Sequence, residues 1–223
     1  MPQISKAFLR ITAITPQKKK GRFNIFLDDK FAFGANLETI VENNLKVGAL
    51  ISVDKVNKII GQEKSTKLLD LATRYLSYRP RSVKEVENYL ASKIAKSEQI
   101  KFREAKESRQ IPIIIQKLKR YKYLNDRQFA KWFFTSRAKS SPRGLAYVKM
   151  ELKLKGIPAD IIEGLAVRSS ELELAKKAVA KKLKRWQARP LIDFKKKFYS
   201  YLLTRGFSYD TIRELFANLT KNV

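Results

Sequence analysis

The chain has 223 residues, of which 48 are Lys or Arg and 21 are Asp or Glu, so its formal charge near neutral pH is +27. It contains no cysteine and no histidine, which excludes disulfides, thiolate metal sites, a cysteine nucleophile and the commonest general base. A charge of this size predicts an acidic partner, either a polyanion or an acidic protein surface.

The sequence also indicates where in the cell the protein lies. No apolar run reaches the ~20 residues that cross a bilayer, and no secretory leader opens the chain. We therefore expect a cytoplasmic protein with no membrane contact. The basic excess lies mainly in residues 63–223, which carry 38 basic and 16 acidic side chains.

Residues 1–60 are predicted to form a small module with a β-hairpin and a short helix. Phe23, Ile25 and Leu27 alternate with Asn24, Phe26 and Asp28, which indicates a strand with one apolar face. Asp28 and Asp29 mark the turn to the next strand. Asn36 is expected to cap a short helix that continues through Leu45, and residues 49–51 are expected to return to the sheet.

Residues 61–124 are predicted to form the first helical repeat. Gly61 weakens the helical pattern that begins near Ser52, and Pro80 ends the helix that follows. Ser82 and Glu85 form a capping box for the next helix. A polar insertion near residues 96–110 precedes a third helix that begins at Ile111.

Residues 125–168 are predicted to form the second repeat. Asn125 is expected to cap its first helix, and Pro142 is placed at the first position of its second helix. Gly156 is expected to adopt the left-handed conformation that closes this helix, with Ile157 packing back on the last turn. Pro158 opens a short third helix.

Residues 169–223 are predicted to form the third repeat. Its first helix is expected to begin at Ser170-Glu171-Leu172-Glu173, and Pro190 separates it from the second. Gly206 and Phe207 repeat the closing turn of the second repeat.

The repeats are visible as fixed offsets in the sequence. Lys155–Ile162 returns 50 residues later as Arg205–Ile212, and Pro80-Arg81 matches Pro142-Arg143 at an offset of 62. Repetition at this scale predicts one helical unit used three times. The expected fold is mainly α, with three tandem three-helix repeats in an elongated curved array after the β-containing module. Such an array favours a binding surface over a catalytic cleft.

The sequence resembles the RecX family, bacterial modulators of the recombinase RecA, over nearly its whole length. The resemblance is carried by the order and spacing of several short motifs, namely Tyr75-Leu76-Ser77-Tyr78-Arg79-Pro80-Arg81-Ser82, Tyr123-Leu124-Asn125-Asp126, Pro142-Arg143-Gly144 and Glu151-Leu152-Lys153-Leu154-Lys155-Gly156-Ile157. The segment Arg22–Asp28 is similar to the extra β-containing module of the family's longer members. The chain departs from the family in its polar insertion and its high lysine content.

The resemblance implies a non-enzymatic regulator of homologous recombination, DNA repair and the SOS response. Family members bind the RecA filament on single-stranded DNA and restrain its ATP turnover, strand exchange and growth. We therefore expect a monomer with no catalytic residue, no cofactor and no metal. Single- or double-stranded DNA is expected as a further partner.

Four arginines, Arg79, Arg81, Arg137 and Arg143, recur where the first helix of a repeat meets the second. They are interpreted either as contacts to the filament or to phosphate, or as structural ion pairs with carboxylates such as Glu85 or Glu151. Both interpretations stay open at this point. The aromatic residues lie mostly at core spacing, and only Trp132 lies off the main apolar face.

The remaining candidates are lysine-rich runs, for which phosphate contact and a solvated surface are both open. The full set of candidate partner- or DNA-binding residues is Lys18, Lys19, Lys20, Arg22, Arg79, Arg81, Arg137, Lys139, Arg143, Lys149, Lys153, Lys181, Lys184 and Arg185.

Two other functions compete with filament regulation. An autonomous basic DNA-binding protein acting through phosphate contacts would also explain the charge. A nuclease is disfavoured by the lack of histidine and cysteine and by the scarcity of paired acids in the repeats.

Overall fold

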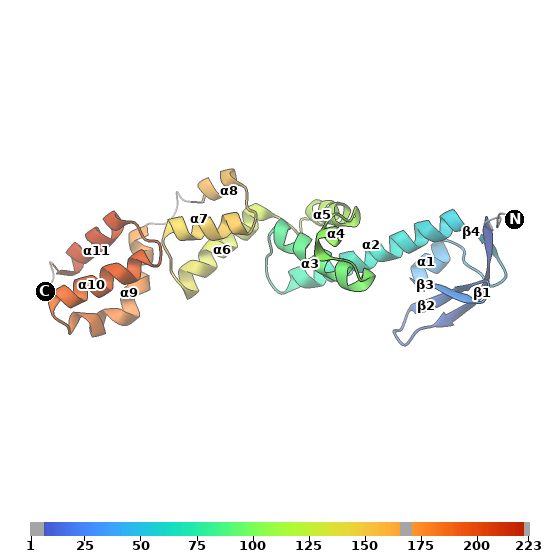
Figure 1. Cartoon of the computed structure of the whole chain (residues 1–223), viewed down its shortest axis with the longest axis horizontal. Coiled ribbons are helices and arrows are strands. Elements are labelled where there is room, and N and C mark those ends of the chain that lie inside the picture. Colours follow the sequence, from blue (N-terminus) through green and yellow to red (C-terminus); the bar gives the residue numbers. More distant parts are fainter. Residues whose placement is uncertain (1–6, 166–170, 221–223) are drawn as a thin grey trace. The chain divides into compact units, whose positions relative to one another are not determined.

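The computed structural model describes residues 7–165 and 171–220 (Figure 1). The chain divides into two compact units, Met1–Ala72 and Thr73–Val223. The predicted class is confirmed, since a small antiparallel sheet precedes a helical part built of three-helix groups.

The sheet of the N-terminal unit has four antiparallel strands in the order β3-β2-β1-β4. They are β1 (Phe8–Pro16), β2 (Arg22–Leu27), β3 (Lys30–Asn36) and β4 (Leu50–Ser52). The predicted hairpin is β2–β3, and Asp28 and Asp29 turn it with φ of 45° and 64°. Aspartate tolerates this left-handed backbone better than most residues. The inner face of the sheet carries the buried side chains of Ile11, Ile25 and Ile51.

Helix α1 (Leu37–Glu42) begins as predicted, because the Asn36 side chain accepts a hydrogen bond from the Thr39 amide. It ends earlier than predicted. Asn44 adopts a φ of 49°, a left-handed conformation that asparagine tolerates, and this turns the chain out of the helix. Leu45 is buried all the same, from the loop that follows.

Helix α2 (Val53–Ser77) is continuous through Gly61, where a weak point was predicted. One glycine costs a helix about 1 kcal/mol relative to alanine, too little to interrupt a 25-residue helix whose Val56 and Ile59 are buried in the core of the N-terminal unit. The carboxylate of Glu63 on this helix is buried and accepts hydrogen bonds from the Arg22 guanidinium, the Asn36 amide and the Thr39 hydroxyl. These bonds hold α2 against the sheet.

The first repeat uses α3 (Val83–Glu98) and α5 (Gln110–Arg120) after the end of α2. The capping box is confirmed, since Ser82 and Glu85 bond each other's backbone amides. The polar insertion is largely helical: α3 extends into it, and α4 (Phe102–Lys106) buries Ala105 against the repeat.

The second repeat contains α6 (Asp126–Ser140), α7 (Leu145–Leu154) and α8 (Ala159–Glu163). Asn125 caps α6 as predicted. The placement of Pro142 at the first position of a helix is wrong, because α7 begins at Leu145 and its N-cap is Gly144. Pro142 instead lies in the connection, where its carbonyl accepts a hydrogen bond from Arg205.

The third repeat contains α9 (Glu171–Gln187), α10 (Leu191–Leu203) and α11 (Tyr209–Thr220). The predicted start at Ser170 lies outside the described residues. Pro190 is the N-cap of α10, as the predicted break there requires. The core of this repeat is apolar and aromatic, with Phe198, Leu202 and Ile212 fully buried.

The closing turns of the second and third repeats are alike. Gly156 and Gly206 have φ of 77° and 76°, the left-handed conformation that ends a helix. Ile157 and Phe207 follow them and are buried. This part of the prediction is confirmed.

Candidate partner-binding surface

The first junction between repeats is built where the closing turn of the second repeat meets the start of α3. Lys155 donates from its ammonium to Glu85 at 2.7 Å, and Lys84 donates to the Leu154 carbonyl at 3.1 Å. A Cβ on Gly156 would lie 2.8 Å from the Cβ of Lys84. The glycine therefore serves both the turn and the close approach of two repeats.

The second junction uses the same arrangement one repeat later. The Gly144 amide donates to the Arg205 carbonyl at 2.9 Å, and the Arg205 guanidinium donates to the Pro142 carbonyl at 3.1 Å. A Cβ on Gly206 would lie 2.7 Å from the Cβ of Tyr147. The sequence repeat is thus also a repeat of docking geometry.

The second and third repeats each begin with an acidic residue that accepts a hydrogen bond from the first amide of a helix in the preceding repeat. Asp126 accepts from the Val83 amide at 2.9 Å, and Glu171 accepts from the Leu145 amide at 3.1 Å. Burial raises the pKa of Asp126, although the bond from Val83 and the charge of Lys119 oppose the shift. Carboxylates at helix N-termini satisfy amides that have no partner within the helix.

The four arginines predicted at helix junctions all have partners inside the protein. Arg79 binds both carboxylate oxygens of Glu85 at 3.1 Å, and Arg137 donates to Glu151 at 2.6 Å. The interpretation of these arginines as structural ion pairs named the same two carboxylates, Glu85 and Glu151.

The other two arginines of this group stack on tyrosines. The guanidinium of Arg81 lies 3.8 Å from the ring centre of Tyr75, and that of Arg143 lies 4.1 Å from the ring centre of Tyr147. A cation over an aromatic face stabilises the local fold. All four arginines therefore contribute to the packing of their own repeats.

Trp132, the aromatic residue predicted to lie off the core, is half-buried. Its ring contacts Phe129, and the Arg79 guanidinium lies 5.4 Å from its centre. It packs at the edge of the second repeat's core.

The remaining candidates divide by exposure. Arg22 is half-buried and its guanidinium is bound to Glu63 at 3.1 Å. Lys149 is half-buried on α7. The exposed candidates are Lys18, Lys19, Lys20, Lys139, Lys153, Lys181, Lys184 and Arg185.

A repeated row of exposed cations runs along α6 in the second repeat and along α9 in the third, where its last member lies just beyond the helix end at Gln187. Arg127, Lys131 and Lys139 have equivalents 50 residues later, and all six side chains are exposed. Within residues 7–165 and 171–220, none of the six forms an ion pair. The equivalents are Lys177, Lys181 and Arg189.

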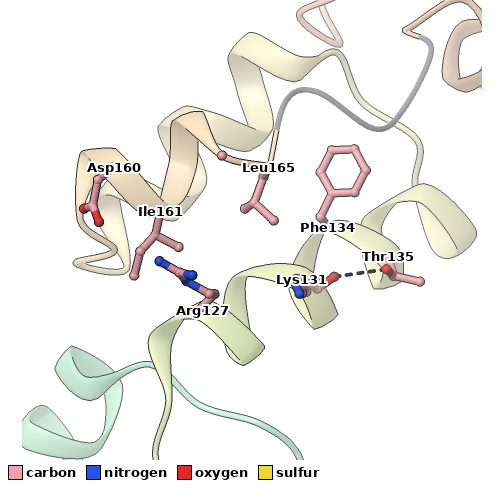
Figure 2. A pocket seen from close by; sticks show the side chains of 8 residues that line it. Arg127, Lys131, Phe134, Thr135, Asp160, Ile161 and Leu165 are labelled. Atoms are coloured by element: carbon pink, nitrogen blue, oxygen red, sulfur yellow. Dashed lines mark hydrogen bonds between the residues drawn. The ribbon is translucent and has the colours of Figure 1, made fainter.

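Beside this row the second repeat carries a pocket of about 510 Å³ between α6 and α8. Figure 2 shows Arg127 and Phe134 projecting from α6, with Ile161 and Leu165 coming from α8 and its end. The other described lining residues are Lys131, Thr135, Asp160 and Gly164. The sequence did not indicate this pocket, because it depends on how far α8 covers α6.

Two exposed tyrosines were also missed. Tyr121 and Tyr123 are 55% and 60% exposed, and their ring centres lie 6.4 Å apart in an edge-to-face pair. Arg120 lies 5.9 Å from the ring of Tyr121. The alternation of cation and aromatic residues in Arg120-Tyr121-Lys122-Tyr123 is a sequence signal that could have identified them.

In the described part of the chain, no three acidic side chains are grouped as a metal ion would require. Among the described helices, none combines the length and apolar content needed to cross a bilayer.

Comparison with protein families matches four segments of the chain. The Regulatory protein RecX N-terminal domain matches residues 9–52. The first, second and third three-helix domains of RecX match residues 69–100, 125–164 and 169–216.

Individual proteins give the same result. The chain is 36% identical over 206 residues to a Regulatory protein RecX of Bacillus pumilus, covering 91% of this chain and 74% of that one. It is also 36% identical to one of Lactobacillus delbrueckii subsp. bulgaricus, covering 89% of this chain and 70% of that one.

Two solved structures share the fold. A crystal structure of regulatory protein RecX, 24% identical, gives a TM-score of 0.65 and covers 94% of this chain and 99% of that one. A crystal structure of RecX from Lactobacillus salivarius, 27% identical, gives a TM-score of 0.58 and covers 71% of this chain and 98% of that one.

Proposed function

Since this chain belongs to the RecX family of regulatory proteins, we propose that it is a non-enzymatic regulator of the RecA recombinase filament on single-stranded DNA. It binds the filament and inhibits its ATP turnover, strand exchange and growth. It does so in the cytoplasm, as a monomer, without a cofactor or metal.

The observation that carries the proposal is the repeated row of exposed cations on α6, on α9 and just beyond the end of α9. Equivalent positions of two successive repeats present the same charge, as in the pair Lys131 and Lys181. A partner that is itself a repeating polymer offers matching acidic positions at successive subunits. Complementary charge of this kind raises the association rate and sets the register of binding.

Inhibition requires no bond-making residue. A ligand that binds one conformation of the filament more tightly than another shifts the filament toward that conformation. A protein that contacts neighbouring subunits in one state therefore slows the structural changes that accompany ATP turnover. Contact across subunits also limits growth.

Reversing the charge at Lys131 and Lys181 together should raise the protein concentration needed to half-inhibit the filament's ATP turnover at least about tenfold. The reason is that two contacts at equivalent positions are lost. The measurement is a titration into the host recombinase on single-stranded DNA, with ATP turnover and filament length followed together. Helical content should stay unchanged, since both side chains are exposed.

The matched control makes the same charge change in the N-terminal unit, at the exposed residues Lys46 and Lys58. This variant should inhibit nearly as well as the unmodified protein. Equal losses in both double variants would show that only the net charge matters, and would count against a defined contact row.

Autonomous DNA binding is the second candidate function, and the exposed pair Tyr121 and Tyr123 favours it. Single-stranded nucleic acid binds where cations track phosphates and aromatic rings stack on bases. Arg120 and Lys122 supply the cations next to the two rings.

Changing Tyr121 and Tyr123 to leucine should lower affinity for single-stranded DNA at least about tenfold, because base stacking contributes ~1–3 kcal/mol per base. The affinity for duplex DNA should change little. Fluorescence anisotropy of the purified protein without recombinase measures both. Tyr78→Leu, at a position 78% exposed, is the control, and an equal effect there would contradict a specific stacking site.

A further inference from the structure

The pocket between α6 and α8 exists because the third helix of the second repeat is short. Helix α8 has five residues, whereas the corresponding helices α5 and α11 have 11 and 12. At equivalent positions Leu215 is fully buried in the third repeat, while Leu165 is half-buried. Among the residues that the structure describes, the five residues of α8 leave Ile161 and Leu165 only half-buried against the core of the second repeat.

The pocket is lined by apolar side chains at its base and by two cations along one edge. Phe134, Ile161 and Leu165 are half-buried, and they pack against the core of the repeat. Arg127 and Lys131 lie four residues apart on α6 and are exposed. Residues so spaced share one face of a helix, so both cations border the same side of the pocket (Figure 2).

The chemistry of the pocket favours a protein over a nucleic acid. Asp160 places a carboxylate on the α8 side of the lining, so anionic groups of any partner are directed to Arg127 and Lys131 and away from α8. The floor offers apolar side chains and one half-buried phenyl ring rather than exposed rings for stacking. A volume of about 510 Å³ lies within the ~300–1,000 Å³ typical of ligand pockets, with room for one or two apolar side chains.

We propose that this pocket receives an apolar side chain from an acidic segment of the partner protein. The apolar side chain covers Phe134, Ile161 and Leu165, and neighbouring carboxylates of the segment meet Arg127 and Lys131. A buried apolar anchor inside a polar, solvent-accessible rim is a common composition of a protein interface. The inference rests on the proposed function, in which the partner is the recombinase filament.

Gly164 offers a way to fill the pocket without disturbing the fold. It lines the pocket and has a right-handed helical backbone, with φ of −64°. A Cβ there would meet only carbonyl oxygens of α8, at 3.5 Å and beyond. Gly164→Trp therefore adds an indole at a residue of the pocket lining, and Gly164→Ala is the matched control.

The test measures the affinity of the full chain for the assembled host filament. Gly164→Trp should weaken binding at least about tenfold, and Gly164→Ala should leave it unchanged. Thermal unfolding reports whether each variant folds. If Gly164→Trp fails to fold, Ile161→Ser, which removes an apolar side chain from the floor, is expected to show the same loss.

A second arm separates the pocket from the proposed function. A labelled peptide with a central leucine between glutamates should bind the unmodified chain and lose affinity about tenfold or more with Gly164→Trp. The same peptide with serine in place of leucine should not bind. If the unmodified chain has no effect on the filament, the proposed function fails. The peptide measurement then tests by itself whether the pocket binds an apolar side chain.

Two results would overturn the inference. One is equal binding of filament and peptide by Gly164→Trp and Gly164→Ala, which would leave filament regulation intact but without this pocket. The other is a loss of affinity for an oligonucleotide and not for protein, which would assign the pocket to nucleic acid.

Discussion

Replacing Gly144 by alanine should separate the third repeat from the second, with a loss of about 3 kcal/mol in the free energy of unfolding. The φ of Gly144 is −62°, so the backbone itself would accept alanine. The obstacle is contact: a Cβ there would lie 1.8 Å from the carbonyl oxygen of Gly206 and 2.2 Å from its carbon. Backbone atoms cannot move aside as a flexible side chain can.

Thermal unfolding should show this as a fall of ~6–12 °C in Tm. Hydrogen exchange should show faster opening at the Gly144 amide, which donates to the Arg205 carbonyl. Gly61→Ala is the control, because a Cβ there meets nothing within 4 Å in the middle of a helix. That variant should be more stable by up to about 1 kcal/mol. An unchanged Tm for Gly144→Ala would contradict the close approach of the two repeats.

Replacing Glu85 by glutamine should lower stability by about 2 kcal/mol at neutral pH, because charge-assisted hydrogen bonds contribute ~1.5–3 kcal/mol. The carboxylate is 17% exposed and binds Arg79 and Lys155, which belong to two different repeats. Loss of its charge leaves both cations without their partner.

The same carboxylate makes this loss depend on pH. Burial alone would raise the pKa of Glu85, but hydrogen bonds and charge from Arg79 and Lys155 outweigh it, so the pKa lies below the ordinary value of 4.5. A lowered pKa in the folded state means that the stabilisation is present above pH ~4.5 and is lost as the pH falls through the folded-state pKa.

Urea unfolding from pH 7 to pH 3 should therefore show the difference between the unmodified protein and Glu85→Gln shrinking in the acid range. Glu173→Gln is the control, since Glu173 pairs with Lys176 while 58% exposed. Its cost should stay below about 1 kcal/mol at any pH. A difference for Glu85→Gln that is constant with pH would mean that charge is not what Glu85 contributes.

Local features of the fold were predictable from short stretches of sequence. The capping box at Ser82 depends on residues three apart, and the closing turns at Gly156 and Gly206 depend on one residue that tolerates positive φ. Both were confirmed. Pro142 was misplaced because proline is common both at a helix start and in the connection before it.

Contacts distant in sequence were not predictable. Asp126 caps a helix whose first amide belongs to Val83, 43 residues earlier. Tyr121 fits the apolar period of α5 but is exposed, because it is the C-cap of that helix and Lys122 turns the chain with a φ of 61°. The pattern of one helix does not state which of its faces a neighbour covers.

The sequence by itself determined the basic character of the chain and its three helical units, because net charge and helical periodicity are properties of composition and local spacing. Only the tertiary structure decided which cations remain available. Arg79, Arg81, Arg137 and Arg143 are engaged within the fold, whereas the Lys131 and Lys181 side chains face solvent. Whether a charge is paired depends on partners brought close by packing, and packing is set by contacts that no local pattern encodes.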